Sequence, residues 1–218
     1  MMNYQDIKSY AEKYAVPIMR TETSKLIADF AKENNPQNIL EIGTAIGYSG
    51  IIMLENSNAN LVTIEHNKEY IKQAKKNFKT RALTNRVKVI DGDCLVVLAN
   101  MVCDEKYKNH FDIIFLDGPK AQYEKMFEMI LILLKSGGTL IVDDVLFHQN
   151  LNQENKVSRR FKTIVSRLEK FIEKCKNCPE FIEFDIKNIE DGVIFAKKRI
   201  KWKKKNLNYL HQLVTLKD

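Results

Sequence analysis

The sequence predicts an α/β fold built on a mostly parallel sheet, and two patterns indicate it. Apolar runs and helical patterns alternate along residues 37–143, which is the spacing of right-handed crossovers between parallel strands. Acidic residues follow several of the apolar runs, at the carboxyl ends of strands where open α/β sheets bind ligands. We therefore expect helices on both faces of the sheet and a ligand site at one edge.

Two helices are expected before the alternation begins, over residues 3–14 and 21–34. Thr21 is the candidate N-cap of the second helix, which should end before Pro36 because proline disfavours helical backbone in the residue that precedes it. The expected strands then span 37–42, 60–65, 86–91, 111–117 and 138–143, with helices between them over 47–56, 67–80, 93–102 and 121–135.

The last part of the domain departs from this alternation. A basic helix is expected over residues 156–174, with an inward-facing set at helical spacing formed by Phe161, Ile164, Val165, Leu168 and Ile172. Two further strands, 181–186 and 192–198, flank Asn188, Asp191 and Gly192 and should form an antiparallel hairpin at one sheet edge. We expect one domain over residues 1–198, with a helical cover over 1–35, followed by a basic tail over 199–218.

Composition favours a single globular domain. The chain has 218 residues, of which 44% are hydrophobic and 29% charged, enough for a sizeable core. No run approaches the roughly 18 apolar residues of a membrane span, and the first residues lack the basic-then-apolar pattern of a signal peptide. We expect a cytoplasmic protein with no membrane partner. The four cysteines are expected to be free thiols, because Cys175 and Cys178 form a C-x-x-C without a second ligand pair for zinc.

The net charge of +7 comes from the end of the chain, since residues 197–218 hold eight Lys or Arg and one Asp. Such a segment can bind phosphates, with Trp202 available to stack on a base, or it can be a solvated terminus.

A glycine turn after the first expected strand is the first candidate for chemistry. Gly43 and Gly47 permit a tight turn against which a ligand can approach the next helix, although Ala45 departs from the dinucleotide G-x-G-x-x-G motif. Glu65 ends the second strand, where a carboxylate can accept hydrogen bonds from a ribose diol; alone it would be a solvated strand end. Asp93 could meet an adenine amino group or cap the next helix.

Three more carboxylates follow the later strands: Asp117, Asp143 and Asp144. Oxygen ligands at neighbouring strand ends suit Mg²⁺, Mn²⁺ or Ca²⁺ and would leave positions for two adjacent substrate oxygens. The alternative is one buried cap and one surface acid at 143 and 144. Adjacent acids after an apolar strand are costly unless a cation is near, which favours the metal hypothesis.

Together these motifs resemble a known family. The segments LEIGTAIGYS, TIEHN at 63–67, DGDC at 91–94, FLDGPKAQY at 115–123 and IVDDVLF at 141–147 resemble class I S-adenosylmethionine (SAM)-dependent methyltransferases. More narrowly, they resemble the divalent-metal-dependent O-methyltransferases that include the catechol and caffeoyl-CoA enzymes. The resemblance covers about residues 17–198 and implies a Rossmann-like seven-stranded sheet and an enzyme that transfers the methyl group of SAM.

The resemblance also implies roles for particular residues. Asp117, Asp143 and Asp144 would hold the divalent cation, expected to be Mg²⁺, although Asp144 stands where the family usually has Asn. Lys120 resembles the family's general base, acting beside Asp117; its alternative is a solvated lysine at a helix start. The residues expected at the cofactor are Met19, Glu41, Gly43, Tyr48, Ser49, Glu65, Asp93, Cys94 and Asp117.

Within the family, residues 16–19, the run at 143–147 and the basic helix look most like the bacterial tRNA 5-hydroxyuridine methyltransferases. That likeness implies methylation of a wobble 5-hydroxyuridine to 5-methoxyuridine in a homodimeric enzyme. The side chains expected to contact tRNA phosphates are Arg159, Arg160, Lys162 and Arg167, with the tail. The alternatives are a small-molecule catechol or hydroxycinnamoyl O-methyltransferase, which would not need residues 199–218, and a non-catalytic SAM-binding protein.

Overall fold

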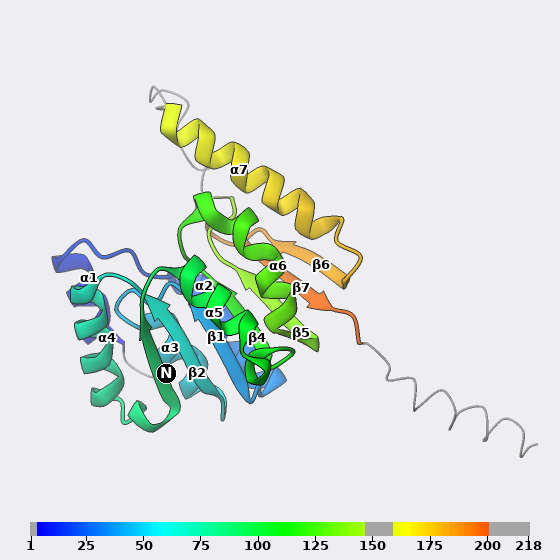
Figure 1. Ribbon diagram of the computed structural model, residues 1–218. Coiled ribbons are helices and arrows are strands. Elements are labelled where there is room, and N and C mark those ends of the chain that lie inside the picture. Colours follow the sequence, from blue (N-terminus) through cyan, green and yellow to red (C-terminus); the bar gives the residue numbers. More distant parts are fainter. Residues whose placement is uncertain (1–3, 147–158, 201–218) are drawn as a thin grey trace, which may run out of the picture.

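The computed structural model describes residues 4–146 and 159–200, and in them the strands form one seven-stranded mixed sheet (Figure 1). The strand order is β3-β2-β1-β4-β5-β7-β6. The first five strands are parallel, while β7 runs antiparallel to both β5 and β6. The predicted mostly parallel sheet with a C-terminal antiparallel hairpin is therefore confirmed. The strands are β1 (Asn38–Ile42), β2 (Asn60–Glu65), β3 (Val87–Asp91), β4 (Phe111–Leu116), β5 (Leu134–Val142), β6 (Phe181–Lys187) and β7 (Val193–Lys198).

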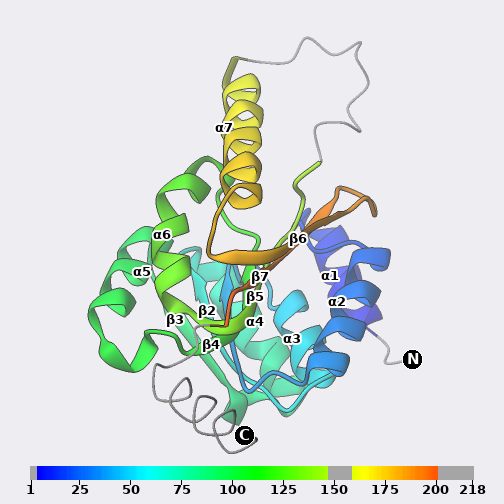
Figure 2. The ribbon, with the colours of Figure 1, turned by 90° about the vertical axis from the view of Figure 1, so that its right-hand side faces the viewer.

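Helices cover both faces of this sheet, as Figure 2 shows in side view. Helices α1 to α4 pack on one face and α5 to α7 on the other. Short 3₁₀ turns lie at Thr84–Arg86 (η1), Glu105–Tyr107 (η2) and Lys120–Gln122 (η3). The α-helices are α1 (Gln5–Lys13), α2 (Thr21–Asn34), α3 (Tyr48–Glu55), α4 (Lys68–Thr80), α5 (Cys94–Cys103), α6 (Tyr123–Leu133) and α7 (Arg159–Lys176).

The two faces are separated by the alternation of side chains along each strand. In β1, Leu40 and Ile42 join the core under α5, α6 and α7, whereas Ile39 joins the core under α1 to α4. The same alternation holds in β5, where Leu140 and Ile141 point to opposite cores. Because both faces are buried, the strands read as nearly continuous apolar runs, which is why they could be recognised in the sequence.

The predicted helices agree with the structure to within about three residues at each end, but the cap of α2 and the end of α6 differ from the prediction. Arg20, not Thr21, occupies the N-cap position of α2, and no side chain of that residue caps the helix. The predicted helix through residue 135 ends at Leu133, because the chain enters β5 at once through Leu134. β5 therefore begins at Leu134, earlier than the predicted strand start at residue 138.

The inward-facing residues predicted for α7 are confirmed only in part. Leu168 is fully buried, Ile164, Val165 and Ile172 are partly buried, and the side chain of Phe161 lies outside the described residues, as do positions 156–158. The sequence prediction missed Phe171 and Cys175, which are also fully buried. The helix begins at Arg159, and Figure 1 shows its first turns standing away from the sheet.

All four cysteines carry free thiols, with Cys94 and Cys175 buried. None of the helices in residues 4–146 and 159–200 combines the length and hydropathy needed to cross a membrane.

Candidate active site

A cavity of about 630 Å³ opens at the carboxyl ends of the parallel strands. It lies where the strand order reverses between β1 and β4, the switch point at which open α/β sheets bind ligands. Backbone hydrogen bonds continue past the strand ends, from Asp117 N–H to Ile42 O and from Asp143 N–H to Leu116 O, and draw the loops together. The predicted residues that line the cavity are Met19, Gly43, Tyr48, Ser49, Glu65, Asp93, Cys94, Asp117, Lys120, Asp143 and Asp144.

The turn after β1 requires glycine at its first position. Gly43 has φ +102°, and a Cβ there would stand 2.2 Å from the backbone oxygen of Asp117. The loops after β1 and β4 are therefore in backbone contact, which leaves no space for any side chain at position 43. Gly47, also at positive φ, then begins α3, so the N-terminus of that helix faces the cavity through Tyr48 and Ser49.

Glu41 is the one predicted cofactor residue that does not line the cavity. Its side chain is fully buried in β1, where it accepts hydrogen bonds of 2.5 Å from Ser49 Oγ and from Thr63 Oγ1. Burial raises the pKa of Glu41 to about 7, although the two hydroxyl donors act in the opposite direction. The residue therefore supports Ser49 from behind the cavity wall instead of touching the cavity itself.

Glu65 is held rigidly at the end of β2. Its carboxylate accepts hydrogen bonds from the backbone N–H groups of Ala45, His66 and Asn67, at 2.9 to 3.0 Å. Only 9% of its side chain is exposed, so the alternative of a solvated strand end is wrong. One of these donors comes from the glycine turn after β1, which ties the turn and the carboxylate into one unit.

Asp93 caps α5, as one of its two interpretations expected, by accepting from Leu95 N–H and Val96 N–H. It also lines the cavity, and its contact with an adenine amino group stays a prediction. Beside it, Cys94 Sγ donates to Gln122 Oε1 at 3.3 Å across the cavity wall. Sequence reasoning did not single out Gln122, although it lies within the FLDGPKAQY motif. It also missed Pro17, Ile18, His66 and Tyr70, which line the cavity but carry no signal that separates them from ordinary loop or helix residues.

The acidic cluster gathers three carboxylates and one ammonium at the other end of the cavity. Lys120 Nζ lies 3.3 Å from Asp144 Oδ2 and 3.8 Å from Asp117 Oδ1. Desolvation raises the pKa of both Asp117 and Asp143, and repulsion among the carboxylates adds to the rise. Asp144 has a left-handed backbone with φ 55°, a conformation that Asn and Asp tolerate better than most residues.

The donor set of this cluster fits a hard divalent cation, because it offers carboxylate oxygens and carries more negative than positive charge. As the side chains stand, no group of three His, Cys, Asp or Glu residues in 4–146 and 159–200 is gathered closely enough to hold a metal ion. In this arrangement Lys120 Nζ pairs with the carboxylates of both Asp117 and Asp144. A metal ion bound by all three acids requires Lys120 Nζ to move aside.

The basic residues of α7 lie partly beside the cavity. Arg167 Nη1 donates to Ala121 O at 3.4 Å, next to Lys120 in η3, and Lys162 is exposed one and a half turns earlier in the helix. Arg159 and Arg160 form the first turn of α7, but their side chains lie outside the description. The basic tail from residue 201 onward is outside it as well.

Comparisons with known proteins agree with this geometry. A family model described as O-methyltransferase matches residues 4–199. The catechol O-methyltransferase of Niastella koreensis is 31% identical over 137 residues, which cover 59% of this chain and 61% of that protein. The chain therefore aligns with about three fifths of the length of this curated relative.

Two solved structures extend the similarity to nearly the whole chain. A candidate caffeoyl-CoA O-methyltransferase from Staphylococcus aureus superposes with a TM-score of 0.79 and 33% identity, over 91% of this chain and 93% of that one. An O-methyltransferase from Bacillus cereus in complex with S-adenosylhomocysteine (SAH) superposes with a TM-score of 0.74 and 25% identity, over 89% of this chain and 90% of that one. With the family model spanning residues 4–199, the chain belongs to the O-methyltransferase family.

Proposed function

We propose that this protein is a SAM-dependent O-methyltransferase that acts on a hydroxyl beside a second oxygen. The observation that carries the proposal is the joining, in one cavity, of a nucleotide-type turn with Glu65 at one end and an acidic cluster with Lys120 at the other. A solved relative that contains SAH supports the choice of cofactor.

The cofactor would lie along the edge formed by the ends of β1, β2 and β3. Glu65, oriented by three backbone donors, would accept hydrogen bonds from the ribose hydroxyls. The adenine would lie between Asp93 and Cys94 at the start of α5. Ser49, whose proton is engaged by Glu41, would present its free lone pairs to the methionine end of the cofactor.

Methyl transfer then needs an acceptor oxygen that has lost its proton and lies in line with the carbon–sulfur bond. Lys120 would first release its carboxylate partners and lose its own ammonium proton to solvent, and the neutral amine Nζ would then take the proton of the acceptor hydroxyl. The oxygen attacks the methyl carbon, the bond to sulfur breaks, and SAH remains. A divalent cation such as Mg²⁺, held by Asp117, Asp143 and Asp144, would supply the Lewis acidity that makes the acceptor hydroxyl easier to deprotonate.

The acceptor that we propose first is 5-hydroxyuridine at the wobble position of tRNA, since its hydroxyl stands beside a carbonyl. The exposed Arg167, which donates to Ala121 O next to Lys120, supports it because it offers a phosphate contact beside the cavity, and Lys162 is a further exposed cation on the same helix. The second candidate is a catechol-type small molecule, which the name of the Niastella koreensis relative favours. Both acceptors present the two adjacent oxygens that the mechanism requires.

Mass spectrometry of products distinguishes these possibilities. The protein is incubated with SAM and either hydroxyuridine-containing tRNA or catechol, with Mg²⁺ or with EDTA. Methylated nucleoside that depends on the cation supports the tRNA acceptor, and methylated catechol alone moves the assignment to small molecules. SAH binding by calorimetry with no methyl transfer to either acceptor would leave a non-catalytic SAM-binding protein.

A further inference from the structure

The tip of the β6–β7 hairpin, residues 189–192, contacts two segments that each contribute residues to the cavity lining, one around Met19 and one around Asp143 and Asp144. We infer that this hairpin tip is a positioning clamp. In it, Glu190 and Asp191 hold the N-terminal segment, residues 17–24, in place relative to the acidic loop, residues 143–146. The inference deepens the proposed function and, for its effect on cofactor binding, rests on it.

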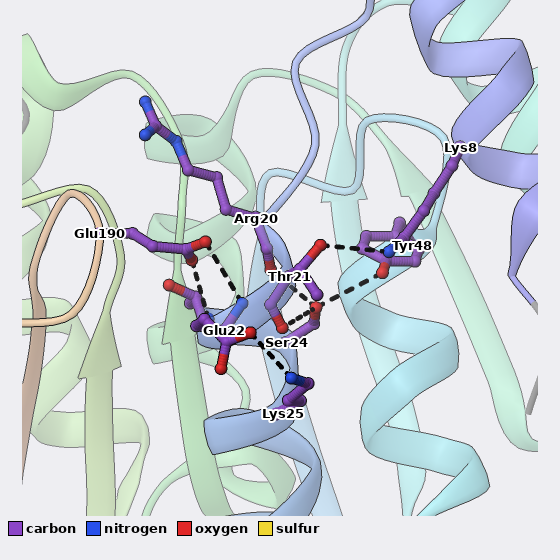
Figure 3. Close-up of polar contacts among 9 residues, drawn as sticks. Lys8, Arg20, Thr21, Glu22, Ser24, Lys25, Tyr48 and Glu190 are labelled. Carbon is purple, nitrogen blue, oxygen red and sulfur yellow. Dashed lines mark hydrogen bonds and ion pairs between the residues drawn. The ribbon is translucent and has the colours of Figure 1, made fainter. Parts of the chain in front are cut away.

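The first contact of the hairpin tip is with the start of α2. The carboxylate of Glu190 accepts from Thr23 N–H at 2.9 Å and from Glu22 N–H at 3.3 Å (Figure 3). These are the backbone donors that a local N-cap would satisfy, and α2 has no side-chain cap of its own. A residue 167 positions away in the sequence from Thr23 therefore caps the helix.

The second contact is an ion pair between Arg20 Nη2 and Asp191 Oδ2, at 2.5 Å. The Asp191 side chain is only 8% exposed, whereas that of Arg20 is 58% exposed, so the acid is the fixed partner. Arg20 directly follows Met19, which lines the cavity. The pair therefore anchors the segment that covers the cavity from the N-terminal side.

Helix α2 connects these hairpin contacts to a residue that lines the cavity. Ser24 Oγ lies 3.4 Å from the hydroxyl of Tyr48, and Tyr48 lines the cavity at the start of α3 (Figure 3). The turn of α2 that Glu190 caps thus packs directly against a cavity residue.

The same hairpin tip holds the acidic loop on the other side. Val145 N–H donates to Gly192 O at 3.0 Å, and Leu146 N–H donates to Asp191 O at 2.6 Å. A Cβ on Gly192 would come within 2.5 Å of the Leu146 side chain, so the two segments are in close contact. These bonds begin immediately after Asp143 and Asp144.

The backbone conformation of the hairpin tip indicates that its contacts hold it in an otherwise unfavourable geometry. Glu190 has φ 51°, a left-handed conformation that is unfavourable for a non-glycine residue. The residue keeps it while its carboxylate caps α2. Arg20, Glu190 and Asp191 do not themselves line the cavity, so they act through Met19, Tyr48 and the acidic loop, as positioning residues.

Amide hydrogen exchange tests the clamp without any ligand. We expect Arg20→Ala and Glu190→Ala to speed exchange in a peptide covering residues 140–146, which contains the acidic loop and neither substituted residue. Lys25→Ala is the matched control, because it removes an ion pair with Glu22 on the same helix whose two side chains are 58% and 59% exposed. Arg20→Lys keeps the positive charge and should restore most of the protection.

Calorimetry with SAH then tests the effect on the site. Arg20→Ala should weaken SAH binding about fivefold, the lower end of typical coupling between distant sites, while Lys25→Ala binds like the wild type. Asp191→Asn combined with Arg20→Ala should lose no more affinity than either alone. A purely structural role would lower the melting temperature but leave SAH affinity unchanged well below it.

Unchanged exchange in residues 140–146 of both Arg20→Ala and Glu190→Ala overturns the clamp, as does SAH affinity within twofold of the wild type in both. If the wild type does not bind SAH but exchange still responds, the proposed function fails while the clamp stands.

Discussion

At the scale of single residues, the cavity wall is supported by Glu41, a buried carboxyl group that does not itself line the cavity. Glu41 is fully buried in β1 and fixes the hydroxyls of Ser49 and Thr63, and Thr63 in turn lies 2.5 Å from Thr44 Oγ1. A chain of short hydrogen bonds thus runs behind the cavity wall. Such a buried network holds its members in fixed positions, but removing an ionisable group from water costs free energy.

The variant Glu41→Gln tests the cost of burying this carboxyl group, through the pH dependence of the free energy of unfolding. Burial raises the folded-state pKa to about 7 from an ordinary value of 4.5, so the folded state binds more protons than the unfolded state between these values. Glu41 should therefore make the free energy of unfolding of the wild type fall as pH rises through that window, by at most about 3 kcal/mol. The variant should lack this contribution and keep only the fall that comes from Asp117 and Asp143, whose pKa values burial also raises.

Urea unfolding at pH 5 and pH 8 measures the difference. The exposed Glu12→Gln serves as control and should follow the wild type at both pH values. Parallel pH profiles for wild type and Glu41→Gln would contradict the assignment of the buried carboxyl.

Lys120→Ala separates proton transfer from cofactor binding. Lys120 lies at the acidic end of the cavity, 3.3 Å from Asp144, and away from Glu65 and Asp93 at the other end of the strand edge. We expect kcat to fall by about 10²- to 10⁴-fold, the usual range for loss of a general base, with SAH affinity unchanged. Steady-state kinetics and calorimetry test both parts, and Lys125→Ala on the exposed face of α6 is the matched control.

At the scale of elements, the sequence located every strand and helix of the described residues to within a few positions, because local patterns determine them. The acidic and glycine signals were visible for the same reason: Gly43, Glu65 and Asp117 each follow an apolar strand. The α2 cap was predicted wrongly at Thr21, since Glu190 supplies it from the far end of the domain. Gln122 was missed because its contact with Cys94 joins η3 to the start of α5, two elements that are separated in the sequence.

Helix α7 offers a test at this scale. Phe171 is fully buried and packs edge-on against Tyr123 and Phe127 of α6, with ring centroids 5.2 and 5.9 Å away. Phe171→Ala should lower the free energy of unfolding by about 3–5 kcal/mol, because it removes a large side chain and leaves a cavity. Urea denaturation measures it, and the exposed neighbour Lys170→Ala should change stability by less than about 0.5 kcal/mol.

At the scale of the whole molecule, the excess positive charge and the cavity-lining residues lie in separate parts of the sequence. The cavity is lined by residues 17–144, and the family model ends at residue 199, whereas residues 201–218 hold five lysines. The expected homodimer stays a prediction, which light scattering of the purified protein would test.

Deleting residues 201–218 should leave SAH affinity within about twofold of the full chain, because no cavity residue is removed. If tRNA is the acceptor, its KM should rise on deletion and its salt dependence should weaken, since each lost phosphate contact lowers the slope by about 0.7–0.9. Catechol kinetics provide the internal control. An unchanged KM for tRNA at every salt concentration would exclude the tail from acceptor binding.

The strand order also has a consequence for synthesis of the chain. β7 is the last described strand to be made, yet it lies inside the sheet, between β5 and β6. Until residue 198 has left the ribosome, the nascent chain must carry β5 with one row of backbone donors and acceptors unpaired. Such an open edge is a template for joining another chain, so translation that stalls before β7 should leave an aggregation-prone intermediate even though every cavity-lining residue is already present.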